Sequence, residues 1–165
     1  MAASEEIRLG HLDERGEARM VDVTGKTPTV RSATAIGEVA CSPEILEALR
    51  DGTVPKGDAL AVARVAGIAA AKKTPDLLPL AHRIGVHGAA VDLEINDDHV
   101  AIEATVRTAD RTGVEMEALT AVTVAALALA GMVKGGERSA YLRRAGVVAK
   151  SGGRSGDWSR ELPHE

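Results

Sequence analysis

Apolar residues gather in one long stretch in the second half of the chain, which predicts a helix over roughly residues 114–134. From Thr120 to Val133 only Thr120 and Thr123 carry polar side chains, so this helix lacks the single apolar stripe of an ordinary surface helix. Lys134 follows directly, which places an ammonium group at the end of a helix that is apolar on all sides. Such a helix must be covered by other parts of the protein or by a partner.

Capping residues predict two more helices in the first half of the chain. Ser42 is a candidate cap for a short helix that Gly52 ends, and the proline after Ser42 is favoured at a first helical position. Asp58 is a candidate cap for a second helix, which continues to about residue 73. This helix ends at Thr74, because a residue that precedes a proline is disfavoured in the helical conformation.

Alternation of apolar and polar residues predicts four strands. The first covers about 29–42, two more lie between 84 and 107 around a turn at 96–98, and the last begins near Ala140. The order strand, helices, strand, strand, helix, strand is that of a ferredoxin-like split βαβ sandwich in the α+β class. We therefore expect an antiparallel sheet with helices on one face. The surfaces left uncovered predict contact with another subunit.

The length of 165 residues favours one domain with its own core. Residues 1–15 are polar and without a period, and we expect them to be mobile. A single ferredoxin-like domain is expected over residues 16–150, and a glycine-rich flexible tail over residues 151–165.

Composition narrows the possible partners and the cellular location. The formal net charge of −4 gives no general attraction to nucleic acid or to anionic lipid, and Tyr141 and Trp158 are too few aromatic residues for a base-stacking surface. Cys41 is the only cysteine, which excludes an internal disulfide and suits a reducing compartment. The apolar run at 121–133 is shorter than a membrane span, and no stretch resembles a signal peptide. We expect a cytoplasmic protein with a small-molecule substrate, no nucleic-acid or membrane partner, no cofactor and no metal.

Two stretches could carry proton-transfer chemistry. In "DLLPLAHRIGVH", His82 stands beside Arg83, and an imidazole next to a guanidinium can hold phosphate or move a proton near neutral pH. A histidine bonded to the backbone is the structural alternative. In "TGVEMEALTAVT", Glu115 and Glu117 lie two residues apart in a first helical turn and so point to different faces. Ordinary pairing with the helix dipole is the alternative for these two.

Three further positions could bind an anion. In "AKSGGRSG", Lys150 and Arg154 flank a serine and two glycines, although the spacing is not that of a Walker P-loop and a disordered basic tail is equally compatible. Lys56 precedes a helix start and Lys134 ends the long helix. A solvated lysine and a lysine that extends along the apolar surface are the structural alternatives for these two.

Four motifs together resemble one family. The stretches are "MVDVTGK" at 20–26, "KGDALAVARVAGIAAAKKTPDLLPLAH" at 56–82, "TGVEMEALTAVTVAAL" at 112–127 and "AKSGGRSG" at 149–156. They closely resemble the molybdenum cofactor biosynthesis protein C family, the cyclic pyranopterin monophosphate synthases, over nearly the whole chain. The resemblance implies a lyase that converts 3′,8-cyclo-7,8-dihydro-GTP to cyclic pyranopterin monophosphate with release of pyrophosphate. It also implies a homohexamer, a trimer of dimers, with active sites at a subunit interface.

The resemblance assigns roles to particular residues. Lys56 and Lys134 match catalytic lysines of the family. The residues that match its substrate-binding positions are Leu80, Ala81, His82, Met116, Glu117, Lys150 and Arg154. Lys134 at the end of its apolar helix is then a cation that faces a triphosphate at a subunit boundary.

Three positions depart from the family pattern. The family has a cysteine where this chain has Ala81, a proline where it has Arg83, and a catalytic aspartate where it has Gly131. A carboxylate three residues before Lys134 would share its helical face and exchange protons with it, which glycine cannot do.

Several interpretations of these departures stay open. A synthase in which Glu137, Glu117 or water replaces the aspartate is favoured, because four matching motifs outweigh one lost position. The alternatives are an enzyme for a related cyclised nucleotide, a catalytically impaired nucleotide-binding homologue, and a non-enzymatic assembly protein.

Overall fold

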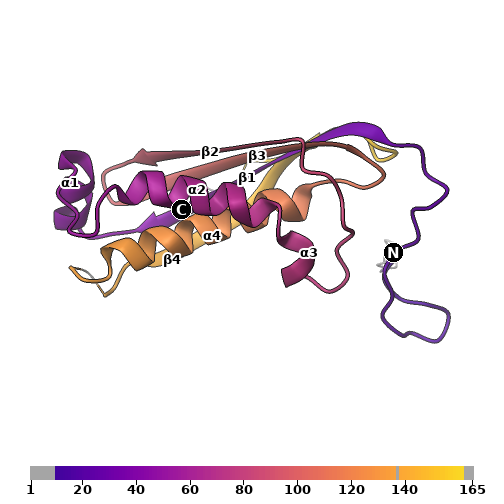
Figure 1. Ribbon diagram of the computed structural model, residues 1–165, viewed down its shortest axis with the longest axis horizontal. Coiled ribbons are helices and arrows are strands. Elements are labelled where there is room, and N and C mark those ends of the chain that lie inside the picture. The colour runs from indigo at the N-terminus through magenta and orange to yellow at the C-terminus, as the bar shows by residue number, and fades with distance from the viewer. Residues whose placement is uncertain (1–9, 137, 162–165) are drawn as a thin grey trace, which may run out of the picture.

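The computed structural model describes residues 10–136 and 138–161, which form one sheet covered by helices on a single face (Figure 1). The strands are β1 (Thr29–Ala40), β2 (Gly88–Ile95), β3 (His99–Asp110), β4 (Tyr141–Ser151) and β5 (Trp158–Ser159), and the helices are α1 (Pro43–Asp51), α2 (Ala59–Ala71), α3 (Thr74–Leu77) and α4 (Glu115–Val133). This arrangement confirms the predicted α+β class.

The sheet has the strand order β2-β3-β1-β4-β5, and every neighbouring pair is antiparallel. The first four strands have the ferredoxin-like order that the sequence predicts. β5 was not predicted: after β4 the chain turns back, and Trp158 and Ser159 pair with Lys150 and Ala149. A two-residue strand is too short to give a periodic signal.

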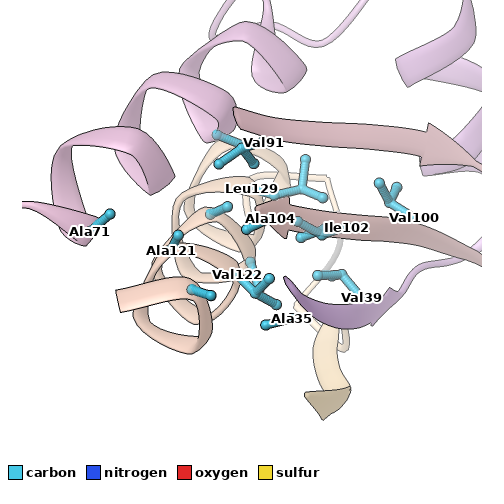
Figure 2. Packing of buried hydrophobic residues seen from close by; sticks show 14 of the residues in the cluster. Ala35, Val39, Ala71, Val91, Val100, Ile102, Ala104, Ala121, Val122 and Leu129 are labelled. Carbon is cyan, nitrogen blue, oxygen red and sulfur yellow. The ribbon is translucent and has the colours of Figure 1, made fainter. Parts of the chain in front are cut away.

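The core lies between the sheet and the helix pair α2 and α4. Ala35 and Val39 of β1 and Ile102 of β3 are fully or almost fully buried, and they pack toward α4 (Figure 2). Small residues let the layers approach closely. A Cβ at Gly37 would lie 2.5 Å from Val122 Cγ1, and one at Gly67 of α2 would lie 2.8 Å from the backbone oxygen of Ala121 in α4.

The predicted helix ends are confirmed. The Ser42 side chain accepts a hydrogen bond from the Ile45 N–H, and the Asp58 carboxylate accepts one from the Ala61 N–H. α1 ends at Gly52, which has a φ of 67° and so suits glycine. α2 ends before Thr74, as predicted, but a further short helix, α3, begins there and was not predicted.

The two strands predicted between residues 84 and 107 are β2 and β3, but the first of them begins later than residue 84. Residues 82–87 have no regular structure, and β2 begins only at Gly88. This segment is bound to β3 by one backbone hydrogen bond, from the His87 N–H to the Arg107 carbonyl at 3.0 Å, and by side chains of β3. The Thr108 hydroxyl donates to the Gly85 carbonyl at 2.5 Å, and the Gly85 N–H donates to Asp110 Oδ2 at 3.2 Å.

α4 is the central helix of the core. With 19 residues it is longer than the apolar run 121–133, and by length and composition alone it could cross a membrane. Eight of its side chains are buried in the protein, which accounts for its apolar character. Its outer face still exposes Leu127 at 71%, and the neighbouring α2 exposes Val65 at 66%. These apolar side chains leave part of the helix layer uncovered in the single chain.

Candidate active site

Two of the predicted site lysines lie at the C-terminal end of α4. Lys56 lies in the loop between α1 and α2, and its Nζ donates a hydrogen bond to the backbone oxygen of Gly131 at 2.9 Å. Lys134 is the residue that ends α4, three positions after Gly131, and its side chain is exposed. Two ammonium groups thus lie at the end of the helix where the backbone carbonyls concentrate negative partial charge. Glu137, a candidate to replace the family aspartate, lies outside the described residues.

A cavity of about 650 Å³ lies at the other end of α4, beside the loop that follows α3. It includes the five predicted substrate-binding residues that lie on α4 or in the loop directly after α3, and its walls are mostly apolar. The lining residues are His11, Ala18, Leu78, Pro79, Leu80, Ala81, His82, Thr112, Gly113, Glu115, Met116 and Glu117. A hollow of this size and character is typical of a small-molecule site.

Glu117 gives the cavity an acid group. Only 4% of the residue is exposed, and this burial raises the pKa of its carboxyl group above the ordinary value, with a further contribution from the Glu115 carboxylate. The Glu117 backbone N–H and the nearby His82 act in the opposite direction. A carboxyl group with a raised pKa can hold a proton that an exposed one would lose. Glu115 and Glu117 both line the cavity, because it spans the first turn of the helix rather than one side of it.

His82 is held by the backbone in one orientation. Its Nε2 lies 2.5 Å from the Val21 carbonyl oxygen, which can only accept, so Nε2 carries the hydrogen and the lone pair of the neutral ring is at Nδ1. The backbone-bonded alternative therefore describes His82, while the ring still lines the cavity. Arg83 is not part of the cavity wall, and its Nη2 donates to Asp76 Oδ1 at 2.6 Å on the surface.

The glycine-rich motif forms a compact turn after β4. Gly152, Gly153 and Gly156 all have positive φ, between 67° and 83°, and a Cβ at Gly152 would lie 2.4 Å from the Val30 backbone oxygen. Lys150 donates a hydrogen bond to the Ser155 hydroxyl, and Arg154 is exposed. β4 ends opposite Ser32, near the start of β1, and β1 begins opposite the last residue of β3. The turn therefore lies at the same end of the sheet as the cavity.

The predicted site residues thus form two groups at opposite ends of α4. Figure 1 shows the same separation, with α3 and its loop at one end of the sheet and α1 at the other. A 19-residue helix is about 28 Å long, so one substrate cannot contact both groups of the same chain. Within residues 10–136 and 138–161, no three His, Cys, Asp or Glu side chains gather in a way that could hold a metal ion. The absence of a metal site stays a prediction.

Sequence reasoning missed two parts of this site. His11 lines the cavity although it belongs to a segment expected to be mobile, and Val21 supplies the carbonyl that holds His82. Neither role has a local sequence signal, because both depend on contacts between distant parts of the chain.

The structure is thus an α+β fold with an apolar cavity at one end of α4 and two lysines at the other. Comparison with known proteins makes this class specific. The model of the MoaC family matches residues 20–153, and the chain belongs to this family. The resemblance that the four motifs predict is therefore confirmed.

Curated relatives match the chain over nearly its whole length. A protein of Streptomyces avermitilis named cyclic pyranopterin monophosphate synthase is 59% identical over 153 residues, which cover 93% of this chain and 90% of the relative. Proteins with the same name from Nocardioides sp. and Geobacter metallireducens are 59% and 51% identical, over 93% and 95% of this chain and 96% and 99% of their own lengths.

Proposed function

We propose that the protein is a cyclic pyranopterin monophosphate synthase of molybdenum cofactor biosynthesis. It converts 3′,8-cyclo-7,8-dihydro-GTP to cyclic pyranopterin monophosphate and releases pyrophosphate. The observation that carries this assignment is the 51–59% identity to synthases that match at least nine tenths of both chains. The alternatives, a related cyclised nucleotide or binding without turnover, rest only on the departures at Ala81, Arg83 and Gly131 and are less favoured.

The two groups of site residues suit different parts of this reaction. Lys56 and Lys134 supply positive charge for a triphosphate and for the pyrophosphate that leaves. Lys150 and Arg154 add cations at the opposite end of the sheet. In the cavity, the raised pKa of the Glu117 carboxyl group suits it to donate a proton to the ring undergoing rearrangement, and His82 can accept one at Nδ1. The apolar walls formed by residues such as Leu80 and Met116 exclude water from that ring.

The complete site needs more than one copy of the chain. Because about 28 Å of helix separates the two groups, we expect the lysines of one subunit to meet the cavity of its neighbour. A homohexamer built as a trimer of dimers provides such interfaces. The exposed side chains of Val65 and Leu127 support burial of the helix layer against a partner. A cytoplasmic location, a core domain over residues 16–150 and flanking segments at 1–15 and 151–165 complete the proposal.

One incubation tests the assignment. The purified protein is mixed with 3′,8-cyclo-7,8-dihydro-GTP, and pterin fluorescence after oxidation and released pyrophosphate are measured together. Wild type should form both products, and Lys134→Ala should form neither at a comparable rate. Lys72→Ala is the matched control, because Lys72 is also an exposed lysine at the end of a helix but lies outside both groups. Absence of pterin from wild type at every enzyme concentration would contradict the proposal.

A further inference from the structure

The N-terminal residues 10–19 form a small hairpin beside the cavity. Leu12 and Ala18 make an antiparallel bridge, and the Arg19 N–H donates to the His11 carbonyl at 2.7 Å. The turn is held by the Asp13 carboxylate, which accepts from two backbone N–H groups at 2.8 and 2.9 Å. Gly16 in the turn has a φ of 77°. The hairpin thus has a defined shape, although it precedes residues 20–153, which match the family.

This hairpin is fixed to the cavity by the chain that follows it. The Val21 carbonyl, two residues after Arg19, accepts the hydrogen bond from His82 Nε2 at 2.5 Å. His11 on the first strand and Ala18 on the second both line the cavity. The hairpin is therefore one wall of the cavity, and His11 is the residue of that wall that has a polar side chain.

The charges of the cavity give His11 a chemical role. Glu115 and Glu117 place two carboxyl groups in the wall, and an anionic nucleotide is repelled by any carboxylate that is ionised. Among the lining residues in the described part of the chain, only His11 and His82 have side chains that can become cationic, and His82 Nε2 is already bonded to Val21. An imidazole titrates near neutral pH and can donate a charge-assisted hydrogen bond to a phosphate or ring oxygen.

We propose that His11 contacts the bound nucleotide-derived substrate and contributes to its affinity. This inference rests on the proposed function for the identity of the substrate. His11 is exposed in the single chain, so its imidazole is accessible for this contact. The contact extends the substrate site beyond residues 20–153.

The test compares full-length wild type with His11→Ala, His11→Gln and the control Glu14→Gln. Glu14 is exposed at the turn of the same hairpin and does not line the cavity. The kcat and KM for 3′,8-cyclo-7,8-dihydro-GTP and the Kd for GTP are measured for each protein. His11→Ala should raise both KM and Kd by roughly tenfold, as expected for a lost hydrogen bond to a charged group. His11→Gln should raise them less, since its amide still donates, and Glu14→Gln should change neither.

A second measurement follows the hairpin directly. Trypsin cleaves after Arg15 and Arg19, which are both exposed, and GTP should slow this cleavage in wild type but not in His11→Ala. If KM and Kd of His11→Ala stay within about twofold of wild type, or if only kcat falls, a role in binding is wrong. If wild type binds GTP but forms no pterin, the proposed reaction fails while the Kd comparison still decides the role of His11. If wild type binds neither ligand, both proposals fail.

Discussion

Replacing Gly131 by aspartate tests whether one lost carboxylate limits the enzyme. Gly131 lies within α4, and a Cβ added there meets no atom within 4 Å. The new carboxylate would lie three residues before Lys134, on the same helical face. It would also lie close to Lys56, whose Nζ already contacts the Gly131 carbonyl at 2.9 Å. The variant therefore places an acid between two lysines without steric cost at the Cβ.

The change in stability should be small because its contributions oppose one another. Aspartate is a better helix former than glycine by a few tenths of a kcal/mol. A negative charge in the last turn of a helix costs about 0.3–1 kcal/mol, and pairing with Lys134 returns about 0.2–0.5 kcal/mol. The free energy of unfolding should thus change by less than about 1 kcal/mol.

A gain in turnover of roughly tenfold or more is expected for Gly131→Asp, because general acid or base groups contribute about 10²–10⁴ in rate.

Rates of pterin formation are compared for wild type, Gly131→Asp and Gly131→Asn. Asparagine has nearly the same shape as aspartate but cannot carry a proton, so it separates charge and proton transfer from packing. Only the aspartate variant should be faster. An equal gain with asparagine would refute the argument from proton transfer, and an unchanged rate with aspartate would mean that another group already supplies the proton. No pterin from any of the three proteins would refute the assignment of Gly131 as a lesion in a synthase.

Four other measurements test the fold and the site. Glu117→Gln should raise the thermal midpoint at pH 8 more than at pH 4. The pKa of Glu117 is higher in the folded protein than the ordinary value of 4.5, so its contribution to stability is fully present below pH 4.5 and is lost as the pH rises through the pKa of the folded state. Glutamine stays neutral and avoids this loss. Gly67→Ala should cost about 1–3 kcal/mol in urea unfolding, since its Cβ would lie 2.8 Å from the Ala121 oxygen, whereas Gly131→Ala should be neutral or stabilising. Lys150→Ala should weaken GTP binding by roughly 1–3 kcal/mol, and equal affinity for GTP and uncharged guanosine would contradict this anion site. Light scattering at micromolar concentration should show a hexamer, and a monomer would contradict the shared site.

Much of the fold followed from the sequence because its causes are local. The caps at Ser42 and Asp58 satisfy N–H groups within three residues of themselves, so the helix starts could be predicted. Alternation along β2 and β3 depends only on which face of the sheet each residue occupies. The start of β2 could not be predicted in this way, because tertiary contacts precede it: the polar groups of Gly85 are satisfied by side chains of Thr108 and Asp110.

The site shows the same division. The sequence by itself determined which residue types are present, their match to a family and the apolar character of α4. Only the tertiary structure decided which of them meet: Val21 and His82 are 61 positions apart, and Lys56 and Gly131 are 75 apart. Such contacts depend on how the helices pack on the sheet, so no periodicity within a few turns of chain can reveal them. The length of α4 likewise limits the site only because site residues from other parts of the chain lie at both of its ends, Lys56 at one end and His82 at the other.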